Sequence, residues 1–93
     1  MDQTAIKEML FGAIKKFQAL SGDEIPTLSD DTVPIGECEG FDSQRAVEVL
    51  VDLESQLGIN LPGDANLFVS EDGTKALSIK TIADRIFKLI SKS

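Results

Sequence analysis

Three stretches of the chain repeat apolar residues at helical spacing, and they limit the fold more than any other feature. Residues 3–20, residues 43–57 and the stretch from Ser78 to Ile90 carry apolar side chains three or four positions apart, the pattern of a helix that buries one face. No stretch of useful length alternates apolar and polar residues as a half-buried strand would. The sequence therefore predicts an all-α fold.

The first and last of these helices each present one apolar stripe. Gly22 follows the first helix as its expected C-terminal stop, and Ser78 precedes the last helix as its N-cap. Phe11 falls outside the first stripe, so we expect it to pack under a loop or to stay partly exposed. The two stripes consist of Ile6, Met9, Leu10, Ala13, Ile14, Phe17 and Leu20, and of Ile79, Ile82, Ala83, Ile86, Leu89 and Ile90.

A short helix is expected between the second and the last long helix. Asp64 is placed to cap it, and Ala65, Leu67 and Phe68 supply its apolar side chains. A polar loop follows at residues 70–76. The chain of 93 residues is long enough for one small core. Residues 1–93 are therefore predicted to form one domain, a small four-helix bundle with three longer helices and one short helix.

Residues 21–42 form a long and acidic loop between the first two helices. Connections of this length are usually functional or disordered. The loop carries seven acidic residues and no basic one, while the whole chain has a formal net charge of -7. Such a field repels nucleic acid and anionic membranes and attracts proteins that present Lys and Arg. We expect the loop to be pinned to the core by its apolar residues, Ile25, Leu28, Val33 and Ile35.

The second helix, residues 43–57, has a wider apolar surface than a single core contact requires. Its main stripe is Ala46, Leu50, Leu53 and Leu57, and the far side holds Glu48, Asp52 and Ser55. Val47 and Val51 lie on a neighbouring row that also contains Glu54. Part of this surface is therefore predicted to be an exposed docking strip with an acidic border.

Composition excludes several classes of function. The chain has no histidine, which excludes imidazole-based triads and histidine zinc sites. Its single cysteine, Cys38, cannot form an internal disulfide, and we expect a small buried or loop side chain in a reducing compartment. No apolar run approaches the ~20 residues that span a bilayer, and no secretory signal begins the chain. We expect a soluble, cytoplasmic protein.

The position that decides the function is Ser43, which opens the second helix. A serine before a helical pattern is ordinarily an N-cap. Here Asp42 is an equally good cap, which frees Ser43 to be the first helical residue with its hydroxyl outward, and Gly40 lowers the steric barrier beside it. A phosphate ester on that hydroxyl would lie at the helix N-terminus, which favours anions. The residues alone leave open which phosphate, and a simple cap remains the alternative.

Two other kinds of site have little support. Residues 70–73, SEDG, lack the glutamate and the alternating oxygens of a calcium loop. A serine hydrolase would need a base near Ser43, and the chain offers neither an imidazole nor a Ser-x-x-Lys spacing there. We therefore predict no metal site and no catalytic residue, so the protein is not expected to be an enzyme.

Over nearly its whole length the chain resembles an acyl carrier protein. The resemblance rests on Asp42 and Ser43, on LGINLP at residues 57–62, and on LSIKTIADRI at residues 77–86. The order of helix, long loop, Asp-Ser, helix, short helix and helix is similar as well. The matching residues of the second helix are Val47 and Glu48, Leu50 and Val51, and Leu53 and Glu54.

This resemblance implies a covalent 4′-phosphopantetheine arm on Ser43, with Asp42 beside it. A phosphopantetheinyl transferase would install the arm from coenzyme A. The arm would carry acyl groups as thioesters and present them to enzymes of fatty-acid, polyketide or related lipid biosynthesis. Basic patches on those enzymes would dock on the second helix. The implied partner-binding residues are Gln44, Arg45, Val47, Glu48, Val51, Asp52 and Glu54.

Two residues depart from the pattern of the family. Gln44 stands where the family usually has leucine, and Arg45 stands where many members have an acid. Both lie beside the attachment point, which favours a specialised carrier over the housekeeping fatty-acid carrier. The alternatives are a peptidyl or aminoacyl carrier with the same arm, and a cofactor-free helical interaction module in which Ser43 is only a cap. We expect a monomer, because a carrier must move between partners.

Overall fold

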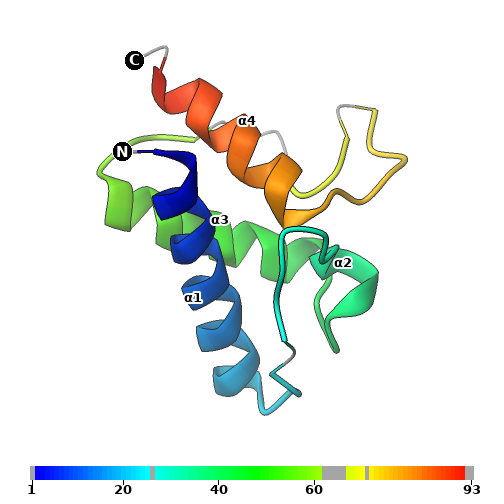
Figure 1. Cartoon of the computed structure of the whole chain (residues 1–93). Coiled ribbons are helices and arrows are strands. Elements are labelled where there is room, and N and C mark those ends of the chain that lie inside the picture. Colours follow the sequence, from blue (N-terminus) through cyan, green and yellow to red (C-terminus); the bar gives the residue numbers. More distant parts are fainter. Residues whose placement is uncertain (1, 26, 62–66, 71, 92–93) are drawn as a thin grey trace.

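The computed structural model describes residues 2–25, 27–61, 67–70 and 72–91. This part of the chain contains the helices α1 (Gln3–Ser21), α2 (Pro34–Glu37), α3 (Ser43–Leu57) and α4 (Ile79–Ser91). Helix α1 packs against both α3 and α4 (Figure 1). The predicted small all-α bundle is confirmed, and the three long helices occupy the stretches that the apolar spacing indicated.

Polar side chains and glycines set the ends of the long helices. Asp2, Asp42 and Ser78 cap α1, α3 and α4, because each accepts a hydrogen bond from the amide three residues later, at 2.9, 2.9 and 3.4 Å. Gly22 and Gly58 end α1 and α3 in the left-handed conformation, at φ of 75° and 69°. The predicted roles of Gly22 and Ser78 are thus confirmed.

The core is built mainly from the predicted stripes, with two differences at their margins. Leu20 lies 72% exposed, because it stands at the last turn of α1, beyond the packed part of that helix. Val49 was left out of the α3 stripe and is fully buried. Phe11 is half-buried against the core, as expected. The buried stripe residues are Ile6, Leu10, Ala13, Ile14, Ala46, Leu50, Leu53, Ile79, Ile82, Ala83 and Ile86.

The long loop between α1 and α3 is tied down differently from the prediction. Leu28 and Ile35 pack against the core and Val33 is half-buried, but Ile25 is 51% exposed and pins nothing. Much of the anchoring comes from the backbone, because the amides of Ile79 and Lys80 donate to loop carbonyls at 2.9 and 3.0 Å. These amides belong to the first turn of α4 and have no partner within the helix. The loop therefore completes the start of α4.

The short helix of the fold lies elsewhere than the sequence pattern indicated. It is α2, a single turn inside the long loop that opens on the buried Pro34. The predicted short helix began at Asp64 with Ala65, both outside the described residues, while Leu67 and Phe68 are buried in a turn. Two apolar residues bury equally well from a turn, so the apolar pair did not require a helix.

A small hairpin-like loop joins that turn to α4. Val69 and Ala76 form an isolated antiparallel bridge. The described polar residues between them, 70 and 72–75, form a loop, as predicted. Arg85 of α4 holds the loop by donating hydrogen bonds to the carbonyls of Leu67 and Val69 at 3.1 and 2.6 Å.

In the parts of the chain that the structure covers, no helix is long and apolar enough to cross a bilayer.

Candidate functional site

The site is built around the first residue of α3, Ser43. Asp42 occupies the cap position, where its Oδ1 accepts from the amide of Arg45 at 2.9 Å and its carbonyl accepts from the amide of Ala46 at 3.0 Å. Ser43 therefore has no capping task. Its side chain is exposed, and no hydrogen bond joins its Oγ to any other residue that the structure describes. The hydroxyl is available from solvent.

Two amides without a described partner lie in the same helical turn as this hydroxyl. The N–H groups of Ser43 and Gln44 belong to the first turn of α3, and neither has a partner in the described chain. Free amides and the positive end of a fifteen-residue helix favour an anionic group on the serine oxygen. The Asp42 carboxylate opposes such a group weakly by repulsion, and its hydrogen bond to the Arg45 amide offsets part of that charge.

The residues just before Ser43 are held in place. Phe41 is 5% exposed, and its ring centroid lies 5.5 Å from that of the fully buried Phe68. The Phe41 amide donates to the Cys38 carbonyl at 3.1 Å. A free hydroxyl therefore stands at the end of a backbone segment that is anchored in the core.

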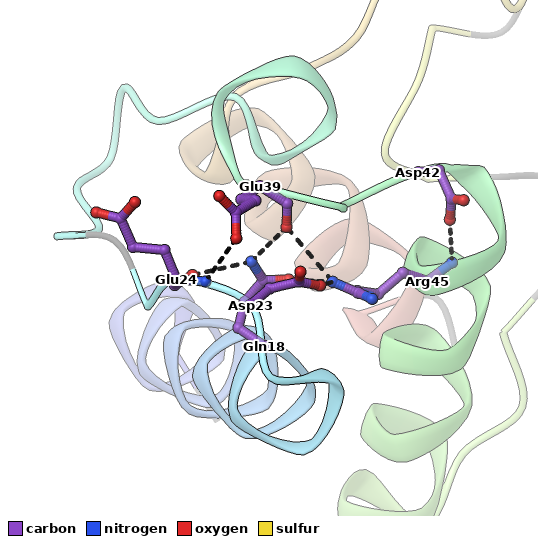
Figure 2. A network of polar contacts seen from close by, with 6 residues as sticks. All are labelled: Gln18, Asp23, Glu24, Glu39, Asp42 and Arg45. Atoms are coloured by element: carbon purple, nitrogen blue, oxygen red, sulfur yellow. Dashed lines mark hydrogen bonds and ion pairs between the residues drawn. The ribbon is translucent and has the colours of Figure 1, made fainter.

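A polar network fastens the same segment to the end of α1 (Figure 2). Its centre is Gln18, a fully buried residue whose Nε2 donates to the carbonyls of Glu24 and Glu39 at 3.1 and 2.7 Å. The Gln18 Oε1 accepts from Nη1 of Arg45 at 2.7 Å. The same Nη1 donates to Oδ2 of Asp23 at 2.7 Å, an ion pair whose side chains are 16% and 25% exposed. The network thus joins α1, the loop and α3.

Gly40 fits this network because it lacks a side chain. Its φ of 68° lies in the left-handed region that favours glycine. A Cβ built there would lie 2.5 Å from Oδ2 of Asp23 and 3.2 Å from Nη1 of Arg45. The ion pair therefore packs directly on the backbone of the residue that stands three positions before Ser43.

The predicted docking strip on α3 is exposed. Val47 and Val51 are 50% and 57% exposed, although both are large apolar residues on a helix that also contributes to the core. They line a shallow groove of about 410 Å³ between α1 and α3. The other residues along the groove are Phe17, Glu48, Asp52 and Ser55. The exposed valines agree with the spacing, but the carboxylates along the groove are Glu48 and Asp52, which the spacing placed on the far side of the helix, and not Glu54.

The charged residues assigned to partner binding differ in how free they are. Glu48 and Gln44 are exposed, and Glu48 forms no ion pair with the described residues. Asp52 is paired with Lys16 at 3.0 Å and is 17% exposed. Glu54 accepts from the Leu61 amide at 3.2 Å. Arg45 does not project a free charge at a partner, because its Nη1 is committed to the network with Gln18 and Asp23.

Two titratable side chains, Cys38 and Asp72, have pKa values that differ clearly from their ordinary ones. Cys38 is 5% exposed, and burial raises the pKa of its thiol, with the neighbouring Glu37 carboxylate adding to the rise. In the loop before α4, hydrogen bonds from Ser70 and Thr74 lower the pKa of Asp72 to about 2. The described residues contain no group of three potential metal-ligating acids or cysteines.

The sequence pattern missed the network but contained one signal of it. Gln18 stands four residues after Ile14, inside the apolar stripe of α1. A polar residue in a buried stripe must find hydrogen-bond partners, so it marks a point where other chain segments converge. Its partners could not be identified from spacing, because Glu24, Glu39 and Arg45 reach it only through the path of the loop.

Comparisons with known proteins leave the site to be interpreted from its own chemistry. No protein-family model, curated protein or solved structure matches the chain.

Proposed function

We propose that this protein is an acyl carrier protein, with a 4′-phosphopantetheine arm on Ser43 that holds acyl groups as thioesters. The proposal rests mainly on the different roles of two neighbouring residues. Asp42 caps α3, and Ser43 keeps an exposed hydroxyl without a described partner. A serine that was only a cap would accept the hydrogen bond that Asp42 accepts here.

The surroundings of Ser43 fit a phosphodiester. The free amides of Ser43 and Gln44 can donate to its oxygens, and the exposed position leaves room for the arm. When bound, the arm supplies a terminal thiol that carries the acyl group. In the transfer from coenzyme A, Ser43 Oγ bonds to the phosphorus next to pantetheine, and the bond from that phosphorus to the adenosine bisphosphate breaks. The serine proton goes to a base of the transferase, since this chain contains no histidine.

The exposed strip on α3 supports a role in presenting cargo to other proteins. Val47 and Val51 would contact an apolar patch of the partner enzyme, and Glu48 would face a Lys or Arg. Asp52 and Glu54 contribute less charge, because one is paired with Lys16 and the other bonds the Leu61 amide. The partners proposed are a phosphopantetheinyl transferase and acyl-processing enzymes of a specialised lipid or polyketide route.

Intact-mass spectrometry tests the proposal. The folded protein is incubated with coenzyme A and a broad-specificity phosphopantetheinyl transferase, and we expect a gain of one phosphopantetheine group. Ser43→Ala should abolish the gain. Ser78→Ala is the matched control, because Ser78 is also at a helix start but acts as the cap, and this variant should still be modified.

Failure of the folded wild-type protein to gain mass would refute the carrier function. The protein would then be better described as a helical interaction module without a cofactor, with Val47, Val51 and Glu48 as its binding surface. Loading assays with acyl and aminoacyl ligases on the modified protein separate the acyl carrier from a peptidyl or aminoacyl carrier, which would use the same arm.

A further inference from the structure

We infer that Arg45 is a positioning residue for the modification of Ser43, because it fixes the loop segment that leads into the serine. The inference rests on the proposed function and names a residue that governs it. Arg45 does not contact Ser43 Oγ. It acts through residues 39–42, the segment of the loop that leads directly into Ser43.

Arg45 contacts that segment twice, through its backbone amide and through its guanidinium group. Its backbone amide donates to Oδ1 of Asp42 at 2.9 Å, which sets the first turn of α3. Its guanidinium Nη1 reaches back to Asp23 at 2.7 Å and lies 3.5 Å from the carbonyl of Glu39. One residue therefore joins Asp42, through its backbone amide, to the loop on the other side of Gly40, through its side chain.

Gln18 makes this attachment part of a buried hydrogen-bond network and not a surface ion pair. We call this network the buried bracket; it consists of Gln18, Asp23, Glu24, Glu39 and Arg45. It is fully buried, and it bonds Arg45 on one side and the carbonyls of Glu24 and Glu39 on the other. The Glu39 carboxylate closes the ring by accepting from the amide of Glu24 at 3.1 Å. If Arg45 leaves, Gln18 Oε1 and the Asp23 carboxylate both lose their charged donor in a largely buried place, which strains the whole bracket.

The contact with Gly40 carries the effect toward Ser43. The Asp23 carboxylate and the Arg45 guanidinium lie where a side chain of residue 40 would otherwise be. Without Arg45, the unpaired Asp23 turns toward water, and the support of the Gly40 backbone goes with it. The loop then samples arrangements in which the transferase cannot reach Ser43 from this side.

A loosened approach has a distinct kinetic signature. If only a fraction of molecules holds the competent arrangement, the apparent affinity falls by that fraction while the chemical step on the bound complex is unchanged. We expect Arg45→Gln to raise the KM of the apo-protein as a transferase substrate about tenfold, with kcat within about twofold of the wild type.

The matched control is Arg85→Gln. Arg85 also anchors a loop through its Nη1, by bonding the carbonyls of Leu67 and Val69, and it shares no hydrogen-bond partner with the network of Gln18, Asp23 and Arg45. The loop that it holds meets the segment before Ser43 only through the ring contact of Phe68 with Phe41. A general loss of stability would appear in both variants, whereas a rise in KM should appear in Arg45→Gln alone. Asp23→Asn keeps the shape of the carboxylate and removes its charge, so it should raise KM in the same direction.

A double-mutant cycle shows whether Arg45 acts through Asp23. The combined Asp23→Asn and Arg45→Gln variant should be no worse than Arg45→Gln, because both changes break one connection. Arg45→Lys retains a cation for Asp23 and should recover part of the wild-type KM. Arg45→Lys also replaces Arg45→Gln as the test variant if Arg45→Gln does not fold. Amide hydrogen exchange should quicken at Glu24 and Phe41 in Arg45→Gln and stay unchanged there in Arg85→Gln.

The outcomes separate this inference from the function on which it rests. An unmodified wild-type protein would refute the carrier function, and the positioning role would fall with it. Modification of the wild type with equal KM values for Arg45→Gln and wild type would overturn the positioning role alone. A rise in KM that Arg85→Gln shares would overturn it too, since the effect would then be general destabilisation.

Discussion

Two loops of this protein each bond an arginine from a neighbouring helix, and the two arginines differ in what they hold. Arg45 fastens the long loop before α3 through a carboxylate and a buried amide, and the loop backbone packs on that ion pair at Gly40. Arg85 fastens the loop before α4 through two backbone carbonyls. The tip of the second loop organises itself around Asp72, which accepts from Ser70 and Thr74.

The difference shows where this small fold fixes its backbone most tightly. The second loop can loosen at its tip without disturbing its neighbours, because its polar contacts are local. The first loop cannot, because Gln18 joins its two ends to α1 and α3. The tightly held loop is the one that leads to the exposed Ser43, so rigid support and a free hydroxyl occur side by side.

The largest contrast is expected from one substitution in each loop. Gly40→Ala should destabilise the protein by about 3 kcal/mol, because a Cβ at a left-handed φ also displaces the Asp23 and Arg45 pair. Gly73→Ala should cost only about 1 kcal/mol, since its φ of 74° is similar but nothing lies within 4 Å of the added carbon. Urea unfolding of both variants measures the difference, and equal losses would break the comparison.

The buried bracket gives the next largest effect. Gln18→Leu keeps a similar volume but leaves Arg45 and the carbonyls of Glu24 and Glu39 without their partner, which should cost about 2 kcal/mol of unfolding free energy. Gln44→Leu is the matched control on the surface and should change stability by less than about 0.5 kcal/mol. Thermal or urea unfolding checks both, and a neutral Gln18→Leu would show that the network contributes little.

Removal of the second arginine should be milder and local. Arg85→Gln is expected to cost about 1 kcal/mol, because it frees two carbonyls that water can reach once the loop loosens. Hydrogen exchange should quicken at the amides of Ser70 and Leu77, which close the hairpin-like loop, and not at Phe41. Faster exchange at Phe41 would mean that the two loops are coupled.

The smallest effect concerns pH and Asp72. Its pKa in the folded protein is lowered from 3.8 to about 2, first by the hydrogen bond from Ser70 and then by those from Thr74. A carboxylate with a lowered folded pKa stabilises the fold above pH 3.8 and loses that contribution as the pH falls to about 2. Asp72→Asn should therefore differ slightly from the wild type near neutral pH and converge with it below this window, as unfolding curves across the range would show. A difference that grows toward low pH would contradict the assignment.

The sequence predicted the helices well because their signals are local. Apolar spacing placed the three long helices, and residue type identified the caps at Asp42 and Ser78. It failed where the same residues suit two structures. Leu67 and Phe68 are buried in a turn, where a helix was predicted, and Pro34 opens a single tight turn, α2, inside the stretch that was predicted to be a loop.

The sequence predicted the exposed hydroxyl of the candidate site, but it did not predict the polar network that holds the neighbouring loop. Asp42 and Ser43 are adjacent, so which of them caps the helix could be argued from two residues. Arg45 was expected to face a partner, because its position on the helix says nothing of a loop that folds back over it. Its bonds to Gln18 and Asp23 span 27 and 22 positions of the chain, beyond any short-range pattern.

The central claim is that the oxygen of Ser43, freed by its neighbour's capping, is the attachment point of a phosphopantetheine arm. The most direct measurement is fragment-level mass spectrometry of the protein after treatment with coenzyme A and a phosphopantetheinyl transferase. We predict that the added group is found on the peptide containing residues 40–45 and is localised to Ser43. An unmodified peptide from folded protein, or the group on another serine such as Ser55 or Ser78, would contradict the account.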